Sequence, residues 1–497
     1  MDFLTFPLLF SFFLAFAYVI VISGRRNFRL PPGPFPLPVI GNLLHLGDKP
    51  HHSLATLSKR YGPLMSLKLG SRTTIVVSSS NIAKEFFHNH DPFFSSRSIP
   101  DSLRVVDHDK YSIVFLPAED QWRKLRKICK EYIFSVRRLD ANELLCRKKV
   151  EELLDHVSDC CTNQKDVNIG EIAFTTVLNV LSNVMFSMDI AQYDSVSSQE
   201  FKDAVRALME FAGKPNIADF FPILKPFDPQ GFVRQGNVYA KKIMTIFDTI
   251  INQRLQTRSS SSFTQTNNDV LDLLLNFNQT NESEFTQNDM RHLFFDLFIA
   301  GTDTTSSTLE WVMTELIHNP EKLKKARLEV IKLMKNKNDI IQESDIFQLP
   351  YLQAVIKETL RLHPPVPFLV PHQAVCDVEI NGYMVPKNAQ VLCNVWAMGR
   401  DSKIWSCPET FLPERFLEVT IDYKGQDFEF IPFGAGRRIC PGLNLAHRML
   451  HTMLGSLLLK FDWKLGGNIK ANDIDMGEKF GVTLQKNEAL MAIPLRL

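Results

Sequence analysis

The chain has 497 residues, 45% of them apolar, and a formal net charge of +1 at pH 7. A chain of this length can bury a large core, and its near neutrality offers no general attraction for phosphates, so nucleic-acid binding is not predicted. The eight cysteines include no C-x-x-C pair and are too sparse for a disulfide framework, which is typical of a reduced cytosolic environment.

The chain begins with an apolar segment. Residues 3–24 carry no charged side chain and are rich in Phe, Leu, Ile and Val. As a helix this run can cross a hydrocarbon core of about 30 Å, and it is longer than the apolar part of a signal peptide. Arg25, Arg26 and Arg29 follow, which by the positive-inside rule keeps the rest of the chain in the cytosol. We therefore predict a single-pass transmembrane anchor at residues 1–24.

A basic and proline-rich hinge is predicted at residues 25–38, because five prolines exclude a helix and favour a stiff, extended chain. The remaining residues, 39–497, are predicted to form the catalytic domain. Near its start, residues 64–69 and 73–78 have the composition of short strands around a turn at residues 70–72. This pattern predicts a small sheet region near the N-terminus.

The predicted helix at residues 121–130 has two distinct faces. Trp122 and Arg126 share one face, since they are four residues apart. Taken alone, this pair is typical of a Trp packed on an Arg stem at a surface. The other face carries three basic residues, Arg123, Lys127 and Lys130. It is either an ordinary solvated face or a docking patch for an acidic electron donor.

Amphipathic helices are predicted across residues 150–255. They are interrupted at residues 213–215 and by a proline-punctuated apolar loop at residues 220–229. Such loops suit either substrate access near a membrane or ordinary core packing. Residues 257–268 are rich in Ser, Thr, Asn and Gln, which predicts a surface loop rather than a domain boundary.

A long helix is predicted at residues 292–318, and its centre is the A-G-T-D-T-T run that begins at Ala300. Thr304 can return its hydroxyl to the carbonyl of Ala300, and Gly301 removes bulk, so a groove can open there. The adjacent carboxylate and alcohol of Asp303 and Thr304 can relay protons into an apolar pocket. From the residues alone, a Thr-rich stretch packed in a helical bundle is equally compatible.

The glycine-rich run F-G-A-G-R-R-I-C-P-G, residues 433–442, delivers Cys440 to the start of a helical pattern. A lone cysteine is usually an inert, small, buried residue, and we expect this of the other seven. Here Gly436 and Gly442 permit a close backbone approach, Arg438 adds a cation, and the following helix offers its positive end. We therefore predict Cys440 as the axial thiolate ligand of a haem iron.

The chain now shows a family resemblance. Phe433, Gly436, Arg438, Cys440 and Gly442 have the spacing of the cytochrome P450 haem-binding signature, and the A-G-x-D-T run resembles the motif of that family's long helix. The resemblance covers essentially the whole chain. Within the family, the chain resembles plant microsomal terpenoid hydroxylases of the geraniol 8-hydroxylase kind, and this resemblance rests on the runs at 295–311, 365–371 and 478–485. It implies a mainly α fold with small β-sheets, preceded by a transmembrane helix.

The resemblance also implies roles for individual residues around haem b. Residues expected to bind the cofactor are Trp122, Arg126, His372, Phe433, Arg438 and Cys440. Residues expected to contact the substrate are Ile299, Ala300, Phe368, Leu369, Val370 and Val482. The segment at 364–372 contains four prolines and is expected to run extended beside the haem, and the turn or strand at 480–484 to reach the substrate. Glu358, Arg361 and Arg415 are expected to form a buried ion network that braces the fold.

The implied activity is that of a monooxygenase that inserts one atom of O2 into a C–H bond of a small apolar substrate. The expected substrate is a terpenoid, either a monoterpenol such as geraniol or a diterpene. Electrons would come from NADPH through NADPH–cytochrome P450 reductase, and the enzyme would sit in the endoplasmic reticulum membrane facing the cytosol. The alternatives are a haem-thiolate isomerase or dehydratase that needs no reductase, and a non-catalytic haem-binding protein. Thr304 and the basic helix face argue against the isomerase or dehydratase, and a non-catalytic haem-binding protein would need Cys440 but no proton relay.

Overall fold

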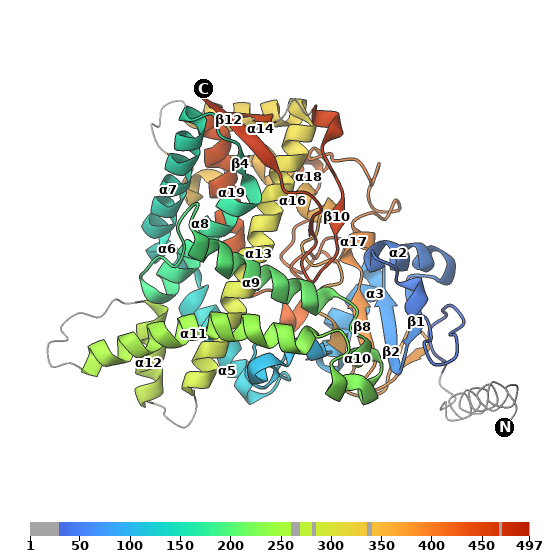
Figure 1. Cartoon of the computed structure of the whole chain (residues 1–497). Coiled ribbons are helices and arrows are strands. Elements are labelled where there is room, and N and C mark those ends of the chain that lie inside the picture. Colours follow the sequence, from blue (N-terminus) through green and yellow to red (C-terminus); the bar gives the residue numbers. More distant parts are fainter. Residues whose placement is uncertain (1–28, 260–268, 281–284, 335–339, 467–469, 497) are drawn as a thin grey trace, which may run out of the picture.

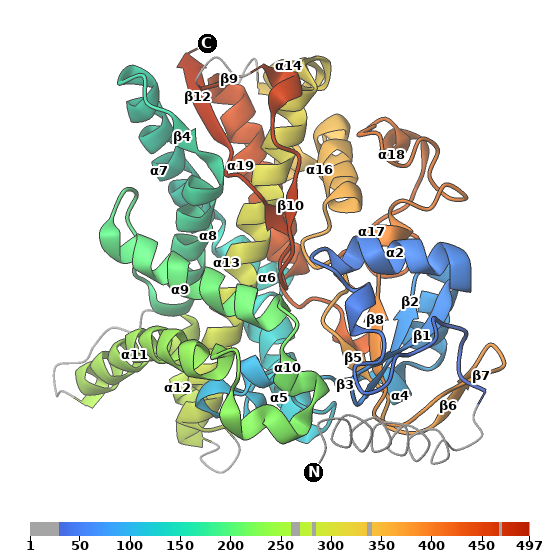
Figure 2. The ribbon, with the colours of Figure 1, turned by 45° about the vertical axis from the view of Figure 1, so that its right-hand side comes forward.

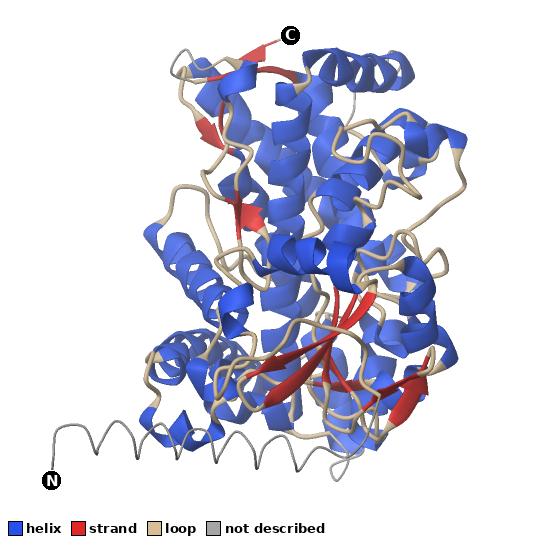
Figure 3. Ribbon diagram, turned by 90° about the vertical axis from the view of Figure 1, so that its right-hand side faces the viewer, coloured by secondary structure: helices blue, strands red, loops and turns tan. Residues whose placement is uncertain are grey.

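A computed structural model describes five stretches of the chain, residues 29–259, 269–280, 285–334, 340–466 and 470–496. Helices make up most of this structure, and the strands form small sheets (Figures 1 and 3). The expectation of a mainly α fold with small β-sheets is therefore confirmed. The anchor predicted at residues 1–24 lies outside the described residues.

The α-helices of the described residues are α2 Pro50–Tyr61, α3 Ser80–Lys84, α4 Asp91–Phe94, α5 Asp120–Ile128, α6 Val136–Ala141, α7 Glu143–Thr162, α8 Ile169–Phe186, α9 Val196–Gly213, α10 Ile217–Phe220, α11 Phe232–Ser259, α12 Val270–Thr280, α13 Gln287–His318, α14 Pro320–Met334, α15 Glu343–Ile346, α16 Pro350–Leu362, α17 Val395–Met398, α18 Arg415–Glu418 and α19 Leu443–Lys460. Helix α5 continues into a π-helical turn at Cys129–Ile133, so the helical structure runs three residues past the end of the helix predicted at 121–130.

The strands are β1 Leu64–Leu69, β2 Arg72–Val77, β3 Ser96–Arg97, β4 Val167–Asn168, β5 His372–Gln373, β6 Val378–Ile380, β7 Tyr383–Val385, β8 Gln390–Cys393, β9 Phe461–Leu465, β10 Glu478–Lys479, β11 Gln485–Lys486 and β12 Met491–Arg496. The largest sheet has the order β1-β2-β8-β5-β3, in which only β2 and β8 are parallel. It lies beside the helical part of the molecule (Figure 1).

Helix α13 runs through the middle of the helical part and packs against α8, α16 and α19 (Figure 2). It begins earlier than predicted because Thr286 and Asp289 form a reciprocal capping box, with the Asp289 N–H donating to the Thr286 hydroxyl over 3.1 Å. A Cβ at Gly301 would lie 2.9 Å from Leu181 of α8. This glycine therefore allows α8 and α13 to approach closely.

Helix α8 is long and apolar enough to cross a membrane, and within the described residues no other helix meets that test. Its apolar window is 89% buried inside the protein. We therefore assign α8 to the core.

The strands predicted at 64–69 and 73–78 are confirmed as the antiparallel pair β1 and β2, although β2 begins and ends one residue earlier, so that Arg72 pairs with Leu69 instead of belonging to the turn. The described part of the proline-rich segment contains no helix, as predicted, and is fastened to β1. The Ser66 N–H donates to the carbonyl of Pro32 over 2.9 Å, and the Ser66 hydroxyl donates to that of Pro31 over 2.6 Å. The body of the protein thus holds the C-terminal half of the predicted hinge.

Two expectations about local structure need correction. Residues 364–372 do not run extended throughout, because the Leu369 N–H donates to the carbonyl of Val366 over 3.0 Å and Leu369 adopts a φ of +53°. The prolines exclude a helix but permit this turn. The loop expected at 257–268 begins later than predicted, because α11 continues to Ser259, and the rest of that loop lies outside the described residues.

Candidate active site

A cavity of about 260 Å³, called here the inner cavity, lies between the Cys440 loop and α13. The loop contributes Cys440 to its wall, and α13 contributes Ala300, Gly301 and Thr304. All six residues predicted to bind the cofactor line this cavity, namely Trp122, Arg126, His372, Phe433, Arg438 and Cys440. Residues of α5, α13, β5 and the Cys440 loop thus meet around one cavity.

The loop around Cys440 is held in a specific backbone conformation. The Cys440 N–H donates to the carbonyl of Phe433 over 2.9 Å. Gly436 has a φ of +65°, and a Cβ there would lie 2.4 Å from the carbonyl oxygen of Phe87, so no other residue fits. Gly442 differs from the expectation, because its φ is −87° and a Cβ would meet protein atoms only at 4.0 Å.

The electrostatics at Cys440 combine opposing effects. Burial raises the pKa of the Cys440 thiol, while the N–H groups of Gly442 and Leu443, which donate to the sulfur, and the charge of Arg126 act to lower it. Burial prevails in the protein alone. A thiolate is favoured here when a metal cation binds the sulfur, since coordination deprotonates a thiol.

Three guanidinium groups line the inner cavity and form what we call the arginine cluster, Arg97, Arg126 and Arg438. Within the described part of the chain, none has an ion pair with a carboxylate. They donate to backbone carbonyls instead, as Arg438 does to Ser95 over 2.8 Å, and the Nε of Arg97 is buried without a partner. Burial and the charges of Arg438 and Arg126 lower the pKa of Arg97. A cluster with this surplus charge fits an anionic group such as the two propionates of haem.

Arg97 was not predicted from the sequence, because no motif surrounds it. It lies directly opposite His372 in the pairing of β3 with β5. The His372 Nδ1 donates to the carbonyl of Phe94 over 2.7 Å, and burial lowers the pKa of this ring. A neutral His372 that donates through Nδ1 has only an acceptor left at Nε2. Arg97 is therefore better suited than His372 to bind a carboxylate.

Trp122 is buried. The interpretation that Trp122 packs on the stem of Arg126 at the protein surface, which the sequence left open, is therefore wrong. Its Nε1 donates to the carbonyl of Ile113 over 3.1 Å, and the guanidinium of Arg438 lies 4.5 Å from its ring centre. Arg126 donates to the carbonyl of Ile439, directly before Cys440. Both residues thus fasten α5 to the thiolate loop.

A second cavity of about 280 Å³, the outer cavity, adjoins the inner one. Both are lined by Ala300 and Thr304. All six residues predicted to contact the substrate line the outer cavity, namely Ile299, Ala300, Phe368, Leu369, Val370 and Val482. Val482 reaches it from the turn between β10 and β11, as expected for residues 480–484. The two cavities together form one space that leads toward Cys440.

The two residues predicted to relay protons lie on different faces of α13. The Thr304 hydroxyl donates to the carbonyl of Ala300 over 2.7 Å, as predicted, and lines both cavities. Asp303 lines neither cavity and accepts a hydrogen bond of 2.9 Å from Gln485. Burial raises the pKa of Asp303, and hydrogen bonds and nearby cations only partly offset this. The structure thus places the hydroxyl at the cavity and the carboxylate behind it.

A polar group in the outer cavity was missed by sequence reasoning. Asp296 of α13 accepts hydrogen bonds from His108 over 2.9 Å, from the Ser112 hydroxyl over 2.8 Å and from the Ile113 N–H over 2.8 Å. His108 and Asp296 both line the outer cavity. The sequence contained one indication that Asp296 faces the cavity, because Asp296, Ala300 and Thr304 are spaced by four residues and share a face of the helix.

Comparison with known proteins agrees with this geometry. The family model of cytochrome P450 matches residues 31–492. The chain is 54% identical to cytochrome P450 76T24 of Catharanthus roseus over 98% of both chains. It is 50% identical to geraniol 8-hydroxylase of the same plant over the full length of both, and 45% identical to ferruginol synthase of Salvia miltiorrhiza over 99% of both. The chain therefore belongs to the cytochrome P450 family and is a haem-thiolate monooxygenase.

Proposed function

We propose that this enzyme hydroxylates a small terpenoid, a monoterpenol such as geraniol or a diterpene, with O2 and electrons from NADPH. The observation that carries the proposal is the apolar outer cavity, which meets the inner cavity at Ala300 and Thr304. Names of relatives, among them geraniol 8-hydroxylase and ferruginol synthase, support the same class of substrate.

Each part of the site has a proposed role. Haem would supply the activation of O2 that allows one oxygen atom to enter a C–H bond. Cys440 would ligate the iron, and the arginine cluster, with Trp122 packed on Arg438, would bind the propionates. Phe433, on whose carbonyl the Cys440 N–H is held, would shape the loop.

Substrate binding and proton transfer are assigned to α13 and its neighbours. Ile299, Phe368, Leu369, Val370 and Val482 would exclude water and position the apolar substrate. The Thr304 hydroxyl would hold a proton at the cavity. Asp303 would serve as the carboxylate from which protons reach this hydroxyl, by turning away from Gln485.

We assign the basic face of α5 to electron delivery by NADPH–cytochrome P450 reductase. Arg123, Lys127 and Lys130 are exposed, while Arg126 on the same helix contacts the carbonyl before Cys440. The basic face thus lies on the thiolate side of the site. An acidic partner would be attracted there, with a dependence on ionic strength.

A membrane location is supported by apolar side chains on the body. The segments that carry them adjoin, because the Gly70 N–H donates to the carbonyl of Ile40 and the Ser71 N–H to that of Phe220. Strongly exposed apolar residues in these segments are Phe35, Val39, Leu44, Ile223 and Phe227. Together with an anchor at residues 1–24 and a hinge at 25–38, they would face the endoplasmic reticulum membrane, with the catalytic domain in the cytosol.

The test uses the full chain reconstituted with a P450 reductase. Substrates from a terpenoid panel should shift the haem absorbance on binding, and at least one should give an oxygenated product that requires both NADPH and the reductase. Product formation without a reductase would instead favour the isomerase or dehydratase. Absence of any product from the panel, despite reduction of the haem, would overturn the proposed substrate class.

A further inference from the structure

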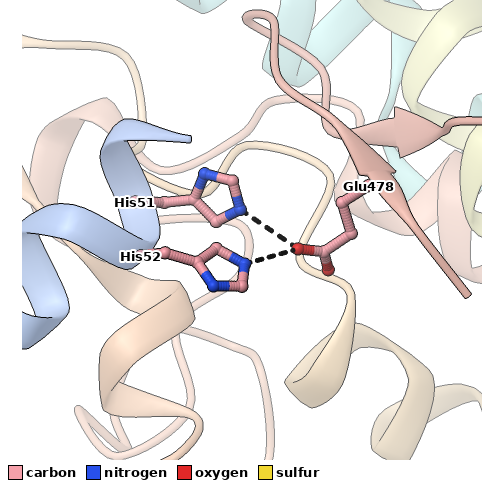
Figure 4. A group of neighbouring side chains, drawn as sticks. All are labelled: His51, His52 and Glu478. Carbon is pink, nitrogen blue, oxygen red and sulfur yellow. Dashed lines mark hydrogen bonds and ion pairs between the residues drawn. The ribbon is translucent and has the colours of Figure 1, made fainter. Parts of the chain in front are cut away.

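A cluster of histidine and glutamate side chains lies between α2 and β10 (Figure 4). His51 and His52, in the first turn of α2, direct Nε2 at the same oxygen of Glu478, Oε2, over 3.0 and 3.2 Å. The three ligand atoms lie within 4.8 Å of one another. His52 and Glu478 line neither cavity, so nothing in the proposed chemistry uses this cluster.

The spacing of these atoms suits a tetrahedral metal ion. Zinc bonds to imidazole nitrogen and carboxylate oxygen are about 2.0–2.2 Å long, which separates neighbouring ligand atoms by about 3.3 Å. The two distances from a histidine Nε2 to Glu478 Oε2 come within a few tenths of an ångström of that value, and the third separation, between the two Nε2 atoms, is at most 4.8 Å. Two imidazoles and one carboxylate form a donor set that zinc uses in sites with an open fourth position.

In the metal-free cluster both histidines donate the proton on Nε2 to Glu478 Oε2. A metal ion would take the place of these two protons, because a ligating imidazole must carry a free lone pair on the bonded nitrogen.

Neighbouring groups orient the carboxylate. The second oxygen of Glu478, Oε1, accepts hydrogen bonds from Trp396 Nε1 over 3.4 Å and from His363 over 3.3 Å. Such outer contacts fix a ligand's direction and raise metal affinity. The nearby cation Arg400 stacks on Trp396 and pairs with Glu409 over 3.1 Å, so part of its charge is offset there.

Access to the cluster comes from the side of His52. Its side chain is 45% exposed, whereas that of His51 is 0% exposed and that of Glu478 is 7% exposed. An ion can therefore arrive from solvent and keep a water molecule as its fourth ligand. We propose that His51, His52 and Glu478 bind a zinc ion that links α2 to β10.

This ion would act on a wall of the outer cavity. The turn after β10 carries Phe480, whose ring is stacked on His51 at 5.4 Å between centres and lies 5.8 Å from that of Phe368. An effect of zinc on substrate binding follows from this contact, and that effect rests on the proposed function. The binding of zinc to the cluster does not rest on the proposed function.

The experiment uses the haem-loaded full chain, stripped of metal with a chelator and dialysed against buffered Zn²⁺. Elemental analysis should then find one zinc per iron, and absorption at the zinc edge should show imidazole ligands. His52→Phe keeps a ring beside Trp396 but removes the ligand, and should weaken zinc binding by at least about tenfold. The matched control is His45→Phe, an exposed histidine just before α2, which should bind zinc as the wild type does.

Glu478→Gln should lose zinc as well, but it also removes the charge that three histidines share, so His52→Phe is the primary variant. Iron content reports whether each variant is folded. Equal zinc binding by folded His52→Phe, or no zinc bound by the wild type at micromolar free Zn²⁺, would overturn the proposal. Neither result affects the test of the substrate class with the terpenoid panel. If the enzyme oxidised no compound of that panel, the result for zinc binding would still hold.

Discussion

Two groups of arginines in this protein are buried under opposite electrostatic conditions. In the first group, Glu358 accepts hydrogen bonds from Arg361 over 2.7 and 2.8 Å and from Arg415 over 3.1 Å. We call this group the brace, and the expected ion network is thereby confirmed. In the arginine cluster of the inner cavity, by contrast, none of the three guanidinium groups is paired with a carboxylate of the described residues.

This difference distinguishes arginines that stabilise the fold from arginines that bind a ligand. The brace places one carboxylate between two guanidinium groups. The remaining donors reach backbone carbonyls, those of Gly399 and Pro408 from Arg361 and that of Ser406 from Arg415. It needs nothing from outside the chain. The arginine cluster keeps like charges close together, which costs free energy unless an anion arrives. Buried arginines that lack a carboxylate therefore point to a binding site for an anionic group.

The largest expected effect lies at the centre of the inner cavity. Cys440→Ser should reduce activity to background and abolish the carbon monoxide spectrum of a thiolate haem, because a neutral hydroxyl is a poor substitute for a thiolate. Cys160→Ser, near the end of α7, should leave both unchanged. NADPH-dependent product from Cys440→Ser would remove the basis for treating the arginine cluster as part of a haem site.

Next in size is the effect of breaking the brace. Glu358→Gln leaves Arg361 and Arg415 buried without a counter-charge and should lower the free energy of unfolding by about 3–5 kcal/mol. Chemical denaturation followed by fluorescence should detect this loss in haem-free and haem-loaded protein alike. A loss confined to the haem-loaded form would show that the brace depends on the cofactor.

A smaller effect is expected at Arg97, and it tests the difference between the arginine cluster and the brace. Arg97→Gln relieves repulsion within the arginine cluster and should leave the haem-free protein as stable as the wild type, while haem affinity falls about tenfold, or about 1.4 kcal/mol. Haem titration and denaturation of the haem-free protein measure the two quantities. Arg415→Gln is the comparison variant and should destabilise both forms. Equal destabilisation by both variants would place Arg97 with the brace.

The smallest effect is expected at α13. Thr304→Ala should keep the haem content and carbon monoxide spectrum, because alanine favours a helix, yet yield severalfold less product for each NADPH consumed, with more hydrogen peroxide. Thr302→Ala is the matched control, since its hydroxyl also donates to the carbonyl four residues back, over 2.7 Å, but lines neither cavity. Unchanged yield in Thr304→Ala would refute the proton relay, including the part assigned to Asp303.

The sequence by itself determined those features that depend on neighbours within one or two turns of chain. The strands β1 and β2, the long helix α13 and the hydrogen bond from Thr304 to Ala300 were all predicted. Each rests on periodicity or on contacts four residues apart, which the local backbone imposes. The glycine-rich loop identified Cys440 for the same reason, although the family resemblance was needed to assign the cavity-lining residues.

Only the tertiary structure decided which distant polar groups converge. Arg97 joined the cofactor residues because β3 pairs with β5, and Gln485 of β11 came to lie beside Asp303. His51 and Glu478 meet although 427 positions separate them. No local pattern encodes such contacts, since they arise when elements far apart in the chain pack together and their buried polar groups must find partners.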